Sequence, residues 1–116
     1  MIAGGEAIVR VPADHGIGGR NQQAALAALG EARARSGAWP AGLLVASIGT
    51  DGEDGPTDAA GGLIDEAVAA SIDTAALTTA LTHCDAYPLL TQAGGLIRTG
   101  PTGTNVADLR IVLAQP

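Results

Sequence analysis

A short apolar run near the middle of the chain restricts most strongly how this protein can fold. Residues 43–48 read LLVASI and lie between Gly42 and Gly49. A run of this length without polar alternation is typical of a strand that is buried on both faces of a sheet. Helices are the usual cover for both faces, so the run predicts a three-layer α/β domain with a parallel or mixed sheet. A chain of 116 residues has room for one such domain, and we expect residues 1–116 to form it.

The composition limits which partners the chain can bind and in which cellular compartment it is expected. Twelve acidic residues face six basic ones, all Arg, for a net charge of −6, which opposes binding to nucleic acid. No apolar run reaches the roughly 18 residues that a membrane span needs. The single Cys84 excludes an internal disulfide and suits a reducing compartment, so we expect a cytoplasmic protein. Whether copies of the chain associate stays open at this stage.

Strand and helix signals alternate along the chain. Strands are predicted at 6–11, 43–48, 96–99 and 109–113, and helices at 20–36, 74–81 and 86–93. Asp73 is the expected N-cap of the helix at 74–81, and Asp58 is a candidate cap for a helix beginning at Ala59. Residues 63–72 fit either a helix or a strand.

The first candidate functional segment is a glycine-rich loop that leads into a helix. It contains Gly18, Gly19 and Arg20 and continues into Asn21 and Gln22. Exposed backbone N–H groups at a helix N-terminus attract anions, and a guanidinium can grip a carboxylate or phosphate with two hydrogen bonds. The alternative is a tight turn followed by a solvated Arg. The segment lacks the third glycine of a dinucleotide-binding fingerprint.

The second candidate segment follows the apolar strand and is rich in acids. Four of the twelve acidic residues, Asp51, Glu53, Asp54 and Asp58, fall within eight positions. Repulsion among these carboxylates would be offset by a cation, and oxygen ligands at this spacing suit Mg²⁺ or Ca²⁺. The alternative is a solvated acidic turn whose Asp side chains cap their own backbone.

The third candidate segment, residues 99–105, is rich in hydroxyl and amide groups. It includes Thr102, Gly103, Thr104 and Asn105. Such neutral donors bind sugars, carboxylates or phosphates, although a loop of this composition is also an ordinary turn.

Taken together, these segments resemble the MOFRL domain, the C-terminal domain of the class II glycerate 2-kinases, which have also been labelled hydroxypyruvate reductases. The matching residues occur in the order of the family and cover nearly the whole chain: 4–6, 18–22, 49–52, 54–61, 99–106 and 108–109. The resemblance implies the smaller C-terminal domain of a two-domain kinase that uses ATP and Mg²⁺ to phosphorylate D-glycerate at its 2-hydroxyl. The Rossmann-like N-terminal domain that completes the cleft has no counterpart in this sequence, so we expect the chain alone to be inactive.

The resemblance also suggests roles for individual residues. Arg20 would stabilise the transferring phosphoryl group or hold the glycerate carboxylate, and Asp51 would accept the hydroxyl proton. The expected metal ligands are Asp51, Asp54 and Asp58. The expected substrate-binding residues share small or neutral polar side chains: Gly18, Gly19, Asn21, Gln22, Thr50, Thr102, Gly103, Thr104 and Asn105.

Two other functions stay open. A free-standing module could bind a small carboxylate or phosphate, or dock onto a separate kinase domain, without catalysis. Reduction of hydroxypyruvate would need a nicotinamide site, for which the sequence has no fingerprint.

Overall fold

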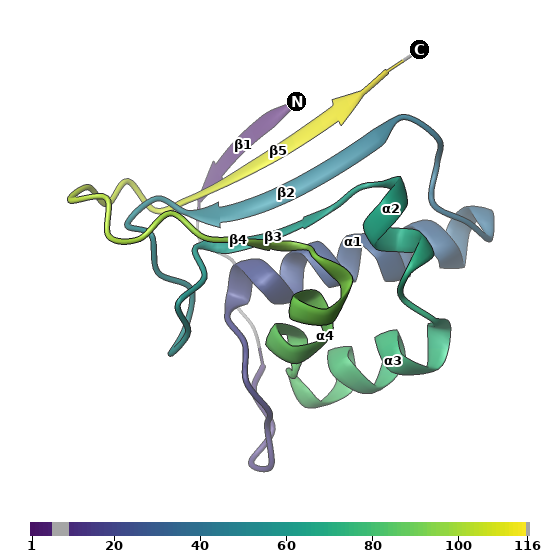
Figure 1. The fold of residues 1–116 in the computed structure, drawn as a ribbon, viewed down its shortest axis with the longest axis horizontal. Helices are drawn as coiled ribbons and strands as arrows, with labels where there is room; N and C mark the ends of the chain where they lie inside the picture. Colours follow the sequence, from purple (N-terminus) through teal and green to yellow (C-terminus); the bar gives the residue numbers. More distant parts are fainter. Residues whose placement is uncertain (6–9, 116) are drawn as a thin grey trace.

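Five strands and four helices make up the part of the chain that the computed structural model describes, residues 1–5 and 10–115 (Figure 1). In chain order they are β1 (Ile2–Gly5), α1 (Arg20–Ser36), β2 (Leu43–Gly49), β3 (Gly61–Ile64), α2 (Glu66–Ala70), α3 (Thr74–His83), α4 (Ala86–Ala93), β4 (Leu96–Ile97) and β5 (Asp108–Ala114). The combination of a sheet with helices confirms the expected α/β class.

The strands form one sheet in the order β1-β5-β2-β3-β4. Each neighbouring pair is antiparallel. On the central strand β2, Val45 lies opposite Ile64 of β3 and Val112 of β5. The expectation of a parallel or mixed sheet is therefore wrong for the described strands. The three helices between β3 and β4 return the chain to the same sheet edge in the opposite direction, so they do not form the crossover that parallel strands require.

The helices lie on one side of the sheet, so the described chain has two layers and not the expected three (Figure 1). Helix α1 packs along β2 and β3, and it is itself covered by α3 and α4. The side of the sheet that faces α1 carries Val45, Ser47 and Ile64, since Ser47 donates a hydrogen bond to Asn21 of α1 at 2.7 Å. No described helix covers the other side.

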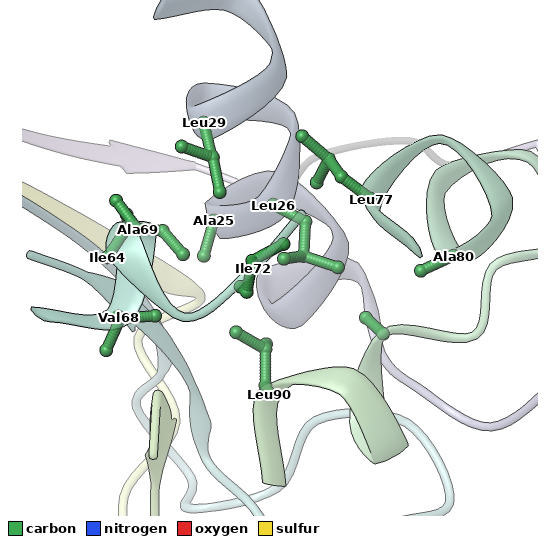
Figure 2. Packing of buried hydrophobic residues seen from close by; sticks show 11 residues of the cluster. Ala25, Leu26, Leu29, Ile64, Val68, Ala69, Ile72, Leu77, Ala80 and Leu90 are labelled. Atoms are coloured by element: carbon green, nitrogen blue, oxygen red, sulfur yellow. The ribbon is translucent and has the colours of Figure 1, made fainter. Parts of the chain in front are cut away.

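The core lies between the sheet and the helices and is built from aliphatic side chains. Leu26 and Leu29 of α1, Ile64 of β3 and Leu90 of α4 are fully buried, and Ile72 is nearly so. Figure 2 shows these side chains directed toward one another from their separate elements. Burial of this kind stabilises each large aliphatic side chain by about 1.5–3 kcal/mol. Among the described helices, none combines the length and apolar character needed to cross a bilayer.

Most of the expected elements are confirmed, and the differences have local causes. The helix at 20–36 has the predicted bounds, and the carboxylate of Asp73 caps α3 by accepting the N–H of Ala76 at 2.7 Å. No helix begins at Ala59. The strand β3 begins two residues later at Gly61. Within it, Gly62 lets α1 and α4 pack so closely that a Cβ would lie 2.9 Å from Leu90.

The N-terminal end of the chain differs from the sequence expectation. The strand β1 at residues 2–5 was not predicted. Within the predicted strand at 6–11, residues 6–9 lie outside the described part of the chain, and residues 10 and 11 are not in a strand.

Candidate functional site

The three candidate segments meet at one end of the sheet. Gly49, the last residue of β2, lies opposite Asp108, the first residue of β5, so the segments 50–60 and 98–107 leave the sheet side by side. The N-terminal end of α1 and the glycine-rich segment before it lie at the same end (Figure 1). The tertiary structure therefore gathers three polar segments that are far apart in the sequence.

The N-terminus of α1 is capped by a carboxylate from the acidic segment. Asp54 accepts the backbone N–H of Asn21 at 2.9 Å on Oδ1 and that of Gln22 at 2.8 Å on Oδ2. The Asn21 amide adds a third hydrogen bond to Oδ1 at 3.1 Å. Asp54 is 2% exposed. The helix N-terminus, which the sequence suggested as a site for an external anion, thus binds an anion supplied by the protein itself.

Gly19 permits this close approach of the two segments. A Cβ on Gly19 would lie 2.3 Å from Cγ of Asp54 and 2.5 Å from its backbone carbonyl oxygen. Gly19 is also the N-cap of α1, in an extended conformation and without a side chain that could cap the helix. The cap of α1 is therefore provided from a distant position in the sequence, where a local capping signal could not reveal it.

Arg20 and Asp108 form an ion pair beside this cap. The Arg20 side chain donates from Nε to Oδ2 at 2.6 Å and from Nη2 to Oδ1 at 3.0 Å. The Asp108 side chain is buried, whereas that of Arg20 is 41% exposed. Burial by itself raises the pKa of Asp108, but hydrogen bonds from Arg20 and Asn21 and the charges of Arg20 and Arg110 outweigh it and lower the pKa. Asp108 therefore holds the Arg20 guanidinium in a fixed orientation as a charged partner.

The second and third segments are joined by Thr50 and Thr102. The hydroxyl of Thr50 donates to the carbonyl oxygen of Ala107 at 2.7 Å and accepts the N–H of Val106 at 2.8 Å. The hydroxyl of Thr102 donates to the carbonyl oxygen of Thr50. Both threonines, which were expected to bind substrate, thus form hydrogen bonds within the protein.

A pocket of about 490 Å³ opens between the first two segments. Among the expected site residues, Gly18, Gly19, Arg20, Asp51 and Asp54 line it. Arg20 supplies a positive charge to the wall, and Asp51 supplies a carboxylate whose Oδ1 accepts the N–H of Glu53 at 3.0 Å. A pocket with both charges suits a small polar molecule that carries an anionic group and a hydroxyl.

Several expected site residues lie elsewhere. Asn21 and Gln22 are buried against Asp54 and Ser47 and make no part of the pocket wall. The third segment contributes none of the residues that line this pocket. Its members Thr102, Gly103, Thr104 and Asn105 are exposed beside it.

Asp58 belongs to an exposed cluster outside the pocket. It accepts the Tyr87 hydroxyl at 2.6 Å and Nε of Arg98 at 3.2 Å. The hydrogen bond from Tyr87, with a smaller contribution from Arg98, lowers the pKa of Asp58. The structure thus does not bring Asp51, Asp54 and Asp58 together as one ligand set, and the described residues contain no group of three His, Cys, Asp or Glu side chains placed to hold a metal ion.

The pocket wall also includes residues that had no assigned role. Glu53 follows Asp51 in the acidic segment, His15 comes from the loop before Gly16, and Cys84 is the C-cap of α3. Glu53 belongs to the acidic segment that the sequence marks as a candidate, where it was given no role of its own. The position of Cys84 does not follow from local sequence, because the packing of α3 against the chain before α1 brings it to the pocket. Its Sγ lies 3.5 Å from the carbonyl oxygen of Arg10, and the N–H of Gly16 donates to the carbonyl oxygen of the neighbouring His83 at 2.9 Å.

Comparison with known proteins gives consistent matches. The model of the MOFRL family matches residues 1–108. D-glycerate 2-kinase of Thermotoga maritima is 47% identical over 115 residues, which are 97% of this chain and 26% of that protein. Glycerate kinase of Homo sapiens is 41% identical over the whole chain and 23% of its own length.

A solved structure extends the match to three dimensions. The crystal structure of glycerate kinase from Thermotoga maritima superposes with a TM-score of 0.86 and 44% identity, over 98% of this chain and 27% of that one. The chain therefore spans about a quarter of the length of the relatives that it matches. A family match over most of its length, together with the same fold in a relative of this identity, shows that this chain belongs to the MOFRL family.

Proposed function

We propose that this chain forms the substrate-cleft part of a glycerate 2-kinase, in which ATP phosphorylates D-glycerate at its 2-hydroxyl. The observation that carries the proposal is the placement of Arg20, fixed by the buried Asp108, on the wall of a pocket that also holds Asp51. The names of the relatives support the substrate class. D-glycerate carries a carboxylate, which suits Arg20, and hydroxyl groups, which suit the carboxylates of the pocket wall.

Arg20 is the residue that we assign to the anionic group of the ligand. Its guanidinium is planar, always charged and held at two points by Asp108, so it presents a preorganised positive charge to the pocket. Such a charge stabilises a glycerate carboxylate in the bound state or negative charge that develops on a phosphoryl group during transfer. The backbone N–H groups at the N-terminus of α1 are occupied by Asp54, whereas the side chain of Arg20 is 41% exposed and lines the pocket, so we assign the anionic group to Arg20.

Asp51 is the residue that we assign to the hydroxyl of the substrate or to Mg²⁺. Kinases hold Mg²⁺ with one or two carboxylates and the nucleotide phosphates, so a three-ligand protein site is not needed. Asp51 and Glu53 on the pocket wall fit that requirement, whereas Asp54 and Asp58 are engaged with α1 and with Tyr87. Bound Mg²⁺ would neutralise charge on the phosphates. Asp51 would accept the proton of the attacking hydroxyl or orient that hydroxyl.

The chain supplies only part of the groups that phosphoryl transfer needs. It contains no Lys, and no segment resembles a nucleotide-binding loop. We therefore assign nucleotide binding to the remaining three quarters of a kinase polypeptide, and we propose that the 116-residue chain alone is inactive.

A chimeric enzyme tests this function. In it, the present chain replaces the matched quarter of the Thermotoga maritima kinase, and the intact kinase is the positive control. We expect the chimera to convert D-glycerate and ATP to 2-phosphoglycerate, identified by ³¹P NMR, and the isolated chain to give no product.

Three outcomes would contradict the proposal. Turnover by the isolated chain at the rate of the intact kinase would show that no partner is needed. Phosphorylation at the 3-hydroxyl would contradict the assigned reaction. A folded chimera that binds D-glycerate without phosphorylating it would favour a binding module.

A further inference from the structure

The side of the sheet that no described helix covers carries large apolar side chains. We name it the open sheet face and define it by Ile2, Leu44, Ile48, Leu109, Ile111 and Leu113. We propose that the open sheet face is the docking surface for the part of a glycerate kinase polypeptide that lies outside the region matched by this chain. The inference rests on the proposed function for the identity of the partner.

The strand register places these side chains on one side. Ser47 and Asp108 point toward α1, since they contact Asn21 and Arg20 there. Side chains alternate along a strand, so Ile48 and Leu109, which follow them and lie opposite each other, point away from α1. The same alternation and pairing bring Leu44 beside Leu113, and Ile111 beside Ile2 of β1.

The apolar character of this face is unusual for a surface in contact with water. An antiparallel sheet with one solvated face ordinarily alternates apolar and polar residues. Here the outward positions of β2 and β5 are Leu44, Ala46, Ile48, Leu109, Ile111 and Leu113, and none is polar. Ile2 is 68% exposed and Leu113 is 56% exposed. A contiguous patch of this kind marks an interaction surface.

The relatives indicate which polypeptide covers the patch. The same fold occurs in the Thermotoga maritima structure, where it accounts for 27% of the chain, so nearly three quarters of that polypeptide lies outside it. A partner with an apolar face, joined in the same polypeptide, can cover the open sheet face without the entropic cost of association. A second copy of this chain is a poorer occupant, because each copy carries a net charge of −6.

Thiol labelling tests the proposal directly. Leu113→Cys places a thiol on the open sheet face, and Ala75→Cys places a matched thiol on the exposed surface of α3, away from the sheet. Each variant is prepared in the isolated chain and in the chimera described above. The rate of reaction with N-ethylmaleimide is followed for each site by peptide mass spectrometry, which separates it from Cys84.

We expect the thiol at position 113 to be protected from N-ethylmaleimide in the chimera and in no other sample. In the isolated chain, both introduced thiols react at similar rates. In the chimera, the thiol of the Leu113→Cys variant reacts at least about tenfold more slowly, because labelling requires local opening of the interface, while that of Ala75→Cys is unchanged. Ile2→Cys on the neighbouring strand provides a second reporter if the first variant does not fold in the chimera.

Two results would overturn the proposal. Equal labelling of Leu113→Cys in the chimera and in the isolated chain would show that the kinase remainder does not cover this face. Protection in the isolated chain that is lost on dilution would identify a second copy as the occupant. Kinase activity is measured separately, so a protected but inactive chimera contradicts the proposed function alone, and an active but unprotected chimera contradicts only the docking surface.

Discussion

The carboxylate of Asp54 accepts the backbone N–H of Asn21 at 2.9 Å, although 33 positions separate the two residues in the sequence. This contact joins the acidic segment to the first turn of α1, and Gly19 gives it the space that it needs. It also supplies the negative charge that the helix N-terminus favours. The pocket therefore lies beside a helix end that the protein itself has capped.

Asp54→Asn should destabilise the fold. The substitution removes the charge that two backbone N–H groups and the Asn21 amide contact, and it leaves buried donors facing an amide. We expect the free energy of unfolding to fall by about 2 kcal/mol, measured by urea denaturation. Glu53→Gln, at an exposed neighbouring position, is the control and should change it by less than about 0.5 kcal/mol. If both substitutions lowered the free energy of unfolding equally, the cap that Asp54 provides for α1 would not explain the loss.

Gly19→Ala should destabilise the fold by overcrowding. The new Cβ would lie 2.3 Å from Cγ of Asp54 and 2.5 Å from its backbone, so the two segments must separate. We expect a loss of about 2 kcal/mol in the free energy of unfolding, measured from the urea midpoint. Gly4→Ala is the matched control, since its Cβ would meet the nearest heavy atom at 3.7 Å. A Gly19→Ala protein as stable as the Gly4→Ala control would contradict the close approach.

Asp108 should make stability depend on pH in the acid range. Its pKa in the folded protein lies below the ordinary value of about 3.9, so its contribution is complete above that pH and is lost as the pH falls through the folded pKa. At pH 7, Asp108→Asn should cost about 1–2 kcal/mol, at the lower end for a charged pair because solvent screens the partly exposed Arg20. The difference between the two proteins should shrink below about pH 4. If the difference in free energy of unfolding between the wild type and Asp108→Asn stayed constant down to pH 2, the charge of Asp108 would not be its cause.

The exposed cluster of Asp58, Tyr87 and Arg98 should contribute little to stability. Its hydrogen bonds and ion pair lie in contact with solvent, where side-chain entropy and screening offset most of the attraction. We expect Tyr87→Phe to change the free energy of unfolding by less than about 0.5 kcal/mol, measured by urea denaturation. A loss above about 1.5 kcal/mol would show that the cluster organises its surroundings.

Arg20→Ala should impair the chimeric kinase. If Arg20 contacts the reacting groups, kcat/KM for D-glycerate should fall at least about tenfold, which corresponds to about 1.4 kcal/mol of transition-state stabilisation. Thermal unfolding of the same variant checks that the chimera remains folded after Asp108 loses the ion pair with Arg20. An unchanged kcat/KM would show that Arg20 does not act on the substrate and serves only the structure.

The sequence determined the individual elements and the composition of the loops. The helix at 20–36 follows from a run of good helix formers that ends at Gly37, which adopts the left-handed conformation as C-cap. The cap of α3 follows from Asp73 beside the first turn. These features depend on residues within a few positions of one another, so local propensity is sufficient to predict them.

Only the tertiary structure decided the strand directions and the use of the polar side chains. The run at 43–48 reads as a strand buried on both faces, yet the described helices cover only one of them. Asp54, Asp51 and Asp58 look alike in the sequence, but one caps α1, one faces the pocket and one binds Tyr87. The physical reason is that the role of a carboxylate depends on the donors that reach it, and here Asp54 and Asp58 accept hydrogen bonds from residues 29 to 40 positions away.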